Sequence, residues 1–479
     1  MNPTDNNISS ADTNEIDASC RVSLLALFGG AALWLVVGLV LGLIGAIKFH
    51  APEFLSACPL MTYGRVAPAA NDAILYGFCI PGALGVMLWI FSRLSHAPLA
   101  LPIVPVVAAH IWHLGVFVGL AGILIGEGTG QPWLEFPRAA AVLLFAAFLL
   151  ISVTAAATFG LREKREAYPS HWFLFAALLL FPWIYSTANL LLIGWPVRGV
   201  AQSVIGWWFA NNLVFIWLAL AGIGTAFYFL PKIASRPLAG SGYTLFAFFS
   251  LLLFGTWCGI PQGAPVPAWL PAASGFAASL TIMPLVAIAI VTQRTVWGAD
   301  VSSRGGSFCF IRFGVLAFLI SGLMYVATAC PQYSRVLEFT WFGPAQVQLQ
   351  LLGFSAMVLF GAIYYVLPRV MGFELPFPKL ARAHFWFFML GVLLFIIPLA
   401  IAGVEQGMKL RDATVPFADA NAAALKFLRW STLGQASILL GALLFAVNLF
   451  AMTIKWKLAL LKSLIAAIKA PLPDAEVKA

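Results

Sequence analysis

Three glutamines stand close together in one long apolar run. The run reads WFGPAQVQLQLLGFSAMVLFGAIYYVLPR from Trp341 to Arg369 and contains Gln346, Gln348 and Gln350. Amides at membrane depth need hydrogen-bond partners, because lipid offers none. Residues four apart share a helical face, so Gln346 and Gln350 are expected to point into a bundle together, with Gln348 on another side. The spacing alone favours hydrogen bonds between helices.

Two histidines form a second candidate site. His110 and His113 are three residues apart in the apolar run from Leu99 to Gly126, so they share a face near the middle of a membrane helix. Intramembrane histidines are costly unless paired, which suggests a heme, a metal or a proton relay. Alternatively, both rings bond to neighbouring carbonyls or hydroxyls. No third ligand can be identified beside them.

The composition indicates the elements that must position these side chains. The chain of 479 residues is 62% hydrophobic and 9% charged, with a mean hydropathy of +0.94. Such a chain is a polytopic membrane protein. Each crossing needs roughly 20 apolar residues and must be helical, because an exposed sheet edge would leave backbone groups unpaired in lipid. The sequence therefore predicts an all-α bundle of about twelve transmembrane helices, with the runs centred near residues 34, 82, 112, 149, 182, 216, 250, 282, 318, 356, 393 and 442.

The two ends of the chain differ from this core. Residues 1–20 are polar and acidic, which predicts a disordered tail and no cleavable signal peptide. The membrane domain is expected over residues 21–455, and the basic residues 456–479 are expected to lie at the membrane interface. Most of the 27 Lys and Arg residues fall inside if both ends are cytoplasmic, which predicts an N-in, C-in protein of the bacterial inner membrane. The net charge of +9 is then explained without nucleic acid.

The six cysteines show no metal-binding spacing. Cys58 and Cys330 both fall on the predicted outer side, where a disulfide between them is chemically possible.

Several motifs, in order along residues 60–455, resemble one family. The polar-x-polar pair at Gln346 and Gln348, followed by LLGF and GAIYYVLPR, resembles the tenth helix of the core subunit, subunit I, of heme-copper oxidases. The resemblance is greatest to the cytochrome cbb-type oxidase and nitric oxide reductase branch. It implies a twelve-helix core with a low-spin heme, a high-spin heme and a copper. Such a core reduces oxygen with electrons from a cytochrome c and couples this reaction to proton movement.

The resemblance also locates the family's ligands, and none is present. The family's heme-ligating histidines correspond here to Ala70, Gln346 and Gln348, its copper-ligating histidines to Ala210, Pro261 and Gln262, and its redox tyrosine to Gly255. Alanine and proline have no ligating atom, and glutamine is a very poor ligand for heme iron. Besides His110 and His113, the only histidines are expected at helix ends or in loops: His50, His96, His171 and His384. This set cannot provide two heme sites and a three-histidine copper site.

Three functions are therefore considered. The first is a non-catalytic structural, assembly or partner subunit of a respiratory complex, in contact with membrane lipid and with a c-type cytochrome subunit. No cofactor is expected in it; heme b and copper are expected only if the ligand positions are misassigned. Aromatic side chains could then fill the porphyrin space, and amides, including Asn189, Asn211 and Asn212, could replace ligation by hydrogen bonds.

The second function is an electron-transfer subunit that binds one heme or metal through His110 and His113. The third is a transporter or channel on the same fold. The third lacks an evident mid-helix carboxylate, because Asp72 and Glu127 are expected near helix ends.

Overall fold

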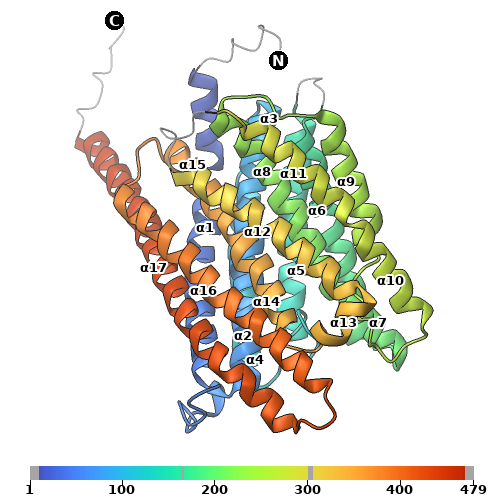
Figure 1. Ribbon diagram of the computed structural model, residues 1–479. Helices are drawn as coiled ribbons and strands as arrows, with labels where there is room; N and C mark the ends of the chain where they lie inside the picture. The colour runs from blue at the N-terminus through green and yellow to red at the C-terminus, as the bar shows by residue number, and fades with distance from the viewer. Residues whose placement is uncertain (1–9, 163–166, 300–305, 470–479) are drawn as a thin grey trace, which may run out of the picture.

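The chain forms a bundle of long helices, and each predicted apolar run lies in one of them. The computed structural model describes residues 10–162, 167–299 and 306–469, and no strand occurs among these residues. Within these ranges, eleven helical segments are long and apolar enough to cross a membrane, and the shorter apolar helix α9 (Ser241–Gly255) accounts for the remaining predicted run. The all-α prediction is confirmed (Figure 1).

Several crossings consist of two or three consecutive helical segments. The elements in chain order are α1 (Ser10–Ile47), η2 (Pro59–Met61), α2 (Tyr63–Asp72), η3 (Ala73–Cys79), α3 (Ile80–Ser95), α4 (Ile103–Ile125), α5 (Arg138–Gly160), α6 (Pro169–Ala188), η4 (Asn189–Gly194), α7 (Val200–Asn211), η5 (Asn212–Trp217), α8 (Leu218–Ala234), α9, α10 (Trp269–Leu280), α11 (Ile282–Val296), α12 (Gly306–Ala329), α13 (Pro331–Leu337), α14 (Phe342–Gln348), η6 (Leu349–Ala356), α15 (Met357–Met371), α16 (Pro378–Leu410) and α17 (Phe417–Lys469). Segments η3, η4, η5 and η6 are π-helical, whereas η2 is a 3₁₀ turn.

Three crossings form the centre of the bundle. In the spans 63–95, 200–234 and 342–371, the most apolar stretch is 100%, 94% and 89% buried, whereas in the other long spans half of it or less is buried. These three spans are therefore surrounded by protein, and polar residues in them, such as Asn71 and Gln348, pair with each other inside the bundle. The motifs of the sequence analysis that contain Ala70, Ala210 and the three glutamines all lie in these central spans.

The first helix begins earlier than predicted. Helix α1 starts at Ser10, inside the segment expected to be a disordered tail. Asp17 accounts for part of this difference, because it is buried, accepts a hydrogen bond from Trp89 Nε1 at 2.8 Å and pairs with Arg93 at 3.5 Å. These contacts with α3 hold the polar start of α1 against the bundle.

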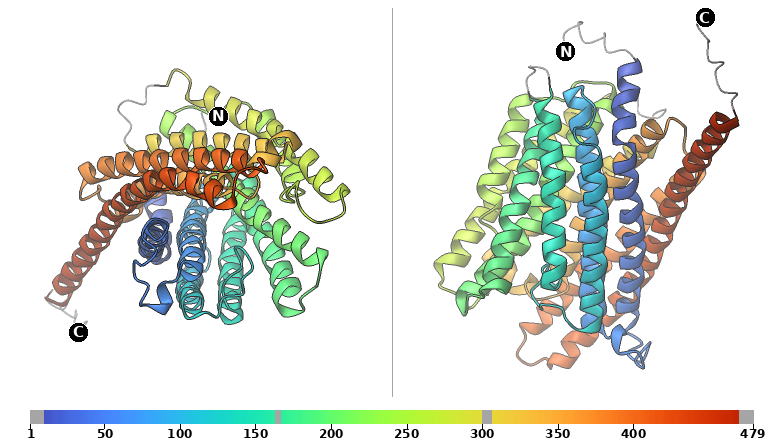
Figure 2. Two further views of the ribbon diagram at one scale, coloured as in Figure 1. Left: turned by 60° about the horizontal axis from the view of Figure 1, so that its bottom comes forward. Right: turned by 180° about the vertical axis from the view of Figure 1, so that it is seen from behind.

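Helix α17 is the longest element, and its last turns stand away from the bundle (Figure 2). Its first part packs along α16, where Gly434 lies so close to Phe395 that a Cβ atom would stand 2.4 Å from the Phe395 backbone nitrogen. Small residues at such contacts allow membrane helices to approach closely.

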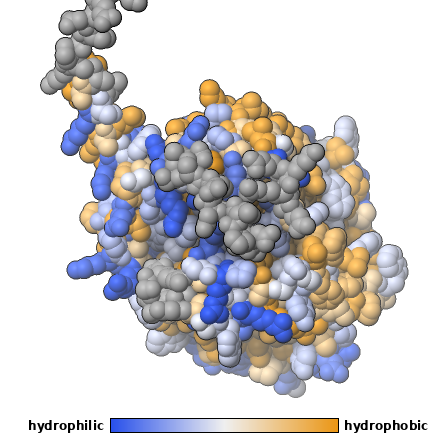
Figure 3. Space-filling model, turned by 90° about the horizontal axis from the view of Figure 1, so that it is seen from above, coloured by the Kyte–Doolittle hydropathy of each residue, from blue (hydrophilic) through white to orange (hydrophobic). Residues whose placement is uncertain are grey.

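Helix α1 begins and α17 ends at the same end of the bundle (Figure 1). Hydrophilic residues spread over the middle and one side of this end, and hydrophobic residues border it (Figure 3).

All six cysteines are free, including Cys58 and Cys330, so the disulfide considered from the sequence is not formed.

Candidate functional site

Three π-helical segments directly follow the residues singled out by sequence. Segment η3 begins three residues after Ala70, η5 two residues after Ala210, and η6 immediately after Gln348. A π-helical turn changes the direction of the side chains on either side of it and is common at functional sites. The distortions mark the region in which a site should be sought.

The first candidate site is a cavity of about 210 Å³ between α1, α2, α14, η6, α16 and α17, here called the amide cavity. Ala70 and Gln348 both line it, although 278 positions separate them in the sequence. Its other walls include the aromatic rings of Phe49, Tyr63 and Trp341. Phe49 stands edge-on to both of the other rings, and its ring centroid lies 4.9 Å from that of Tyr63 and 5.0 Å from that of Trp341.

Amides supply the polar groups of this cavity. Gln348 Nε2 donates to Asn71 Oδ1 at 2.8 Å, which joins α14 to α2. Gln435 of α17 also lines the cavity, and its Oε1 is buried without a hydrogen-bond partner. Ser431 and Thr432 add hydroxyl groups to the same wall. The cavity thus offers neutral hydrogen-bonding groups next to aromatic surface.

The other two glutamines face a different helix. Gln346 Nε2 donates to the Ser321 carbonyl of α12 at 3.4 Å. Gln350 is 1% exposed, its Nε2 has no partner, and it lines a smaller cavity that α12 also borders. The structure therefore places Gln346 and Gln350 on the α12 side and Gln348 on the α2 side.

The smaller cavity, of about 40 Å³, is here called the tyrosine cavity. Tyr325 Oη donates to Asn211 Oδ1 at 2.7 Å, and Asn211 Nδ2 donates to the Gly255 carbonyl at 2.9 Å. Gly255 is the position at which the resemblance expects a tyrosine, and Tyr325 of α12 supplies a phenol beside it. The sequence analysis missed Tyr325, because no local motif links α12 to Asn211 or Gly255.

Two further positions, at which the resemblance expects copper-ligating histidines, lie in a connector. Helix α9 ends at Gly255, so Pro261 and Gln262 fall in the irregular stretch before α10. The Glu338 carboxylate accepts hydrogen bonds from the backbone N–H of Gln262 at 2.7 Å and of Gly263 at 2.9 Å. The Gln262 side chain donates to the Pro271 carbonyl at 2.8 Å. These contacts fix the connector, and neither Pro261 nor Gln262 lines the amide cavity or the tyrosine cavity.

Each of the two intramembrane histidines contacts a carbonyl oxygen. His110 is exposed, and its Nδ1 is 2.7 Å from the Val106 carbonyl of its own helix. The ring of His113 packs over Gly30 of α1, with Nε2 3.2 Å from the Ala26 carbonyl. One ring therefore stays beside α4 while the other contacts α1.

Some polar residues lie deeper than the sequence suggested. Asp72, expected near a helix end, is fully buried within the continuous span 63–95, and neither of its carboxylate oxygens has a hydrogen-bond partner. Glu135, in the loop between α4 and α5, interacts with it electrostatically. Burial raises the pKa of Glu135 to about 7. His384, expected at a helix start, is fully buried in α16, with Nδ1 3.1 Å from Tyr364 Oη.

The donor atoms decide whether a heme or a copper fits these cavities. Of the residues that the structure describes, none with an imidazole or thioether lines either cavity, and Tyr63, 43% exposed, is the only one lining the amide cavity whose side chain is of a type that ligates heme iron. Cys258 lines the tyrosine cavity, where burial raises the pKa of its thiol to about 12, so the metal-binding thiolate is disfavoured at neutral pH. Among the described residues, no three His, Cys, Asp or Glu side chains are grouped to hold a metal. The side chains present do not fit bis-imidazole heme or a three-histidine copper.

Comparison with known proteins identifies related sequences and a related fold. The family model described as cytochrome c and quinol oxidase polypeptide I matches residues 23–438. A cytochrome c oxidase subunit 1 homolog of Azorhizobium caulinodans is 25% identical over 452 residues, which is 88% of this chain and 80% of the relative. The cbb3-type cytochrome c oxidase subunit CcoN1 of Stutzerimonas stutzeri is 23% identical over 398 residues, which is 79% of this chain and 82% of the relative.

A solved structure supports the fold. The chain matches a heme-copper terminal oxidase, studied as a dimer by cryo-electron microscopy, with a TM-score of 0.75 and 15% identity. The match covers 93% of this chain and 84% of the other.

Proposed function

Because the chain belongs to the cytochrome c and quinol oxidase polypeptide I family, as a membrane protein of the heme-copper oxidase subunit I type, we propose that it is a non-catalytic member. In this proposal it acts as a structural, assembly or partner subunit of a respiratory complex in the bacterial inner membrane, with both ends in the cytoplasm. The observation that carries the proposal is the amide cavity, which Ala70 and Gln348 both line and whose described lining residues include no imidazole. Fold alone does not establish activity, so the side chains of the site decide.

Hydrogen bonds take the place of ligation in this proposal. Gln348 and Asn71 join α14 to α2, while Tyr325 and Asn211 join α12 to α7 and the end of α9. In the related catalytic subunits, the resemblance implies that metal centres connect helices in this region. Amide and phenol contacts can connect helices without metal, because each buried polar group gains a partner.

In this proposal, aromatic packing fills part of the porphyrin space that the resemblance implies. A heme-sized cavity between the spans 63–95 and 342–371 would contradict complete filling of this space by aromatic side chains. The amide cavity lies there, but its volume of about 210 Å³ is below the roughly 300–1,000 Å³ of common ligand pockets. Phe49, Tyr63 and Trp341 are the aromatic residues that line it.

The electron-transfer alternative has less support. A heme or metal shared by His110 and His113 needs both rings to reach one point, whereas His110 turns back to Val106 and His113 contacts α1. The transporter alternative gains one observation, the buried carboxylate of Asp72, which the sequence analysis had placed near a helix end. Intramembrane carboxylates often mark ion or proton pathways.

The test is a spectrum of the purified protein. We expect the reduced-minus-oxidised visible spectrum to lack a Soret band, and the pyridine hemochrome assay and copper analysis to give amounts far below one per chain. The CcoN1 subunit of Stutzerimonas stutzeri, expressed in the same host, is the positive control for heme insertion. A stoichiometric heme would overturn the proposal and make His110→Ala and His113→Ala the next variants.

The partner half of the proposal needs a separate experiment. The tagged chain, purified from its native membranes in mild detergent, is expected to retain other respiratory subunits, including a c-type cytochrome detectable by heme staining. If the chain is recovered alone under conditions that keep a control oxidase intact, the partner role fails even where the spectrum lacks heme.

A further inference from the structure

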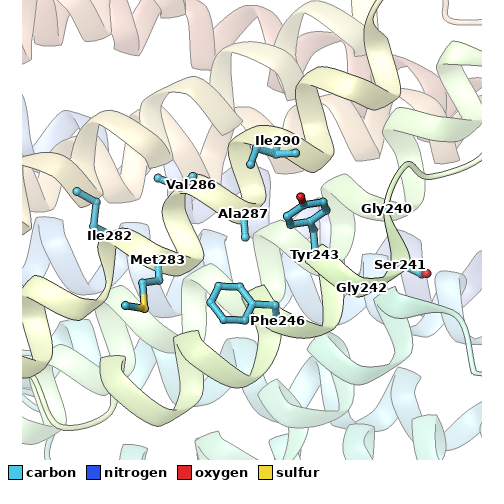
Figure 4. A pocket seen from close by; sticks show the side chains of 10 residues that line it. All are labelled: Gly240, Ser241, Gly242, Tyr243, Phe246, Ile282, Met283, Val286, Ala287 and Ile290. Atoms are coloured by element: carbon cyan, nitrogen blue, oxygen red, sulfur yellow. The ribbon is translucent and has the colours of Figure 1, made fainter.

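A groove of about 780 Å³ runs between α9 and α11 on the outside of the bundle. Figure 4 shows Phe246 of α9 and Met283, Val286 and Ile290 of α11 along it. Met283, Val286 and Phe246 are 42–52% exposed, so the groove presents hydrophobic surface to its surroundings. Among the residues that the structure describes, no charged side chain lines it.

One end of the groove is cationic. Helix α11 continues one turn past Ile290 to Arg294, whose guanidinium lies 5.6 Å from the ring centroid of Tyr243 at the same end of α9. Arg236 is held against the residues that follow α11, because its guanidinium donates to the carbonyls of Trp297 and Gly298, the latter at 2.7 Å. Among the described residues, no carboxylate lies within ion-pair distance of either arginine.

Helix α9 adds a second anion-attracting group at this end. It begins after Gly240, which has a φ of +72°, and no side chain caps its first amides. Uncapped N–H groups and the helix dipole make a helix N-terminus favourable for anions. Trp297, 71% exposed, stands at the same end, as is typical of tryptophan at a membrane surface.

From this arrangement we propose that the groove binds an acyl chain of an anionic phospholipid, with the lipid phosphate at Arg294 and the first turn of α9. The groove supplies apolar surface for the chain, and its cationic end supplies charge for the headgroup. A partner transmembrane helix would match the apolar walls, but it would match the arginine end only with a carboxylate at that level, whereas every anionic phospholipid carries an acidic headgroup. Helix α9 has 15 residues and spans about 22 Å, less than the roughly 30 Å hydrocarbon core, so it cannot reach both headgroup layers. The exposed Trp297 and the two arginines favour its N-terminal end as the one near the headgroups.

Native mass spectrometry of the full chain with added lipid tests the charged end. We expect the wild type to retain phosphatidylglycerol roughly fivefold better than phosphatidylcholine of the same acyl chains, as expected for about 1 kcal/mol per basic residue near an anionic lipid. Arg294→Gln should remove this preference. Arg312→Gln, which removes another exposed arginine outside the groove, should keep it. Equal retention of the two lipids by the wild type, or equal behaviour of the two variants, would overturn the site.

The apolar part has its own test. Gly242 lines the groove, and a Cβ atom there would meet nothing within 4 Å, so Gly242→Phe introduces a ring at the groove without a clash at Cβ. This variant should lose the bound phosphatidylglycerol, whereas Gly160→Phe, at an equally open glycine on α5, should keep it. Circular dichroism verifies that both variants are folded. If a polypeptide instead of a lipid is retained on the wild type and lost in Gly242→Phe, the groove belongs to a partner subunit and the lipid assignment is wrong.

Discussion

At the scale of residues, the contact between Tyr325 and Asn211 is the hydrogen bond that we propose takes the place of a metal ligand. The phenol satisfies an amide oxygen that is otherwise enclosed among α7, α9 and α12. A buried polar atom that loses its partner costs about 1–3 kcal/mol.

We therefore predict that Tyr325→Phe lowers the free energy of unfolding by about 2 kcal/mol, because Asn211 Oδ1 loses its donor. Thermal unfolding in detergent measures the loss. Tyr333→Phe is the matched control, since Tyr333 is 57% exposed and its hydroxyl should contribute little. Equal melting temperatures for the two variants would show that the Tyr325 contact is not stabilising.

A second prediction concerns Glu135, because burial raises the pKa of its carboxyl to about 7 from an ordinary value of 4.5. The folded protein then holds this proton at pH values where the unfolded chain has released it. Stability should be highest below about pH 4.5 and should fall by roughly 2–3 kcal/mol as the pH rises to 7.

Melting temperatures between pH 4.5 and 8 test this dependence, with Glu135→Gln as the comparison. The variant cannot ionise at this position, so its curve should be flatter than that of the wild type. Glu127→Gln, at an exposed carboxylate in the same loop, should leave the curve unchanged. A Glu135→Gln curve parallel to the wild type would show that Glu135 does not cause the effect.

At the scale of elements, the connector between α9 and α10 depends on one carboxylate. Glu338, just beyond α13, bonds to two consecutive backbone amides of the connector. Charged hydrogen bonds of this kind are stronger than neutral ones.

We predict that Glu338→Ala exposes the amides of Gln262 and Gly263, because both lose their acceptor, at a local cost of about 1–3 kcal/mol. Hydrogen exchange of these two amides should accelerate, while exchange within α11 stays unchanged. Glu53→Ala removes an exposed carboxylate from a different loop and serves as the control. Unchanged exchange in Glu338→Ala would refute the role of this carboxylate.

The helices were predictable from sequence to a large extent, whereas the candidate site was predictable only in part. Runs of about 20 apolar residues have one stable form in lipid, so the predicted centres all fall in helices. The separate directions of Gln346 and Gln348 also followed from helical periodicity. Tyr325 and Gln435 could not be found this way, because packing of distant helices brings them to the cavities. The π-helical segments likewise have no simple sequence signal.

At the scale of the whole molecule, the proposed absence of cofactors has a consequence for folding. If amides and aromatic rings hold the central crossings together, the protein should fold without heme. We predict that cells unable to make heme yield as much folded protein, with the same melting temperature, as heme-replete cells. Size-exclusion chromatography and thermal unfolding measure both quantities.

The CcoN1 subunit of Stutzerimonas stutzeri, produced in parallel, is the control and should fall in yield without heme. A comparable fall for this chain would mean that heme takes part in its folding, contrary to the proposal.

The π-helical turns next to Ala70, Ala210 and Gln348 bear on how such a protein can arise. A ligand side chain is lost by one point mutation, and the helix around it is left in place. Removing a π turn requires deleting a residue, which would rotate the remaining half of the helix by about 100° and turn every later side chain away from its neighbours. Side chains can therefore diverge quickly while the backbone distortion is inherited. Distant descendants of a catalytic ancestor should be easier to recognise by the positions of their π-helical turns than by the residues at the ancestral ligand positions.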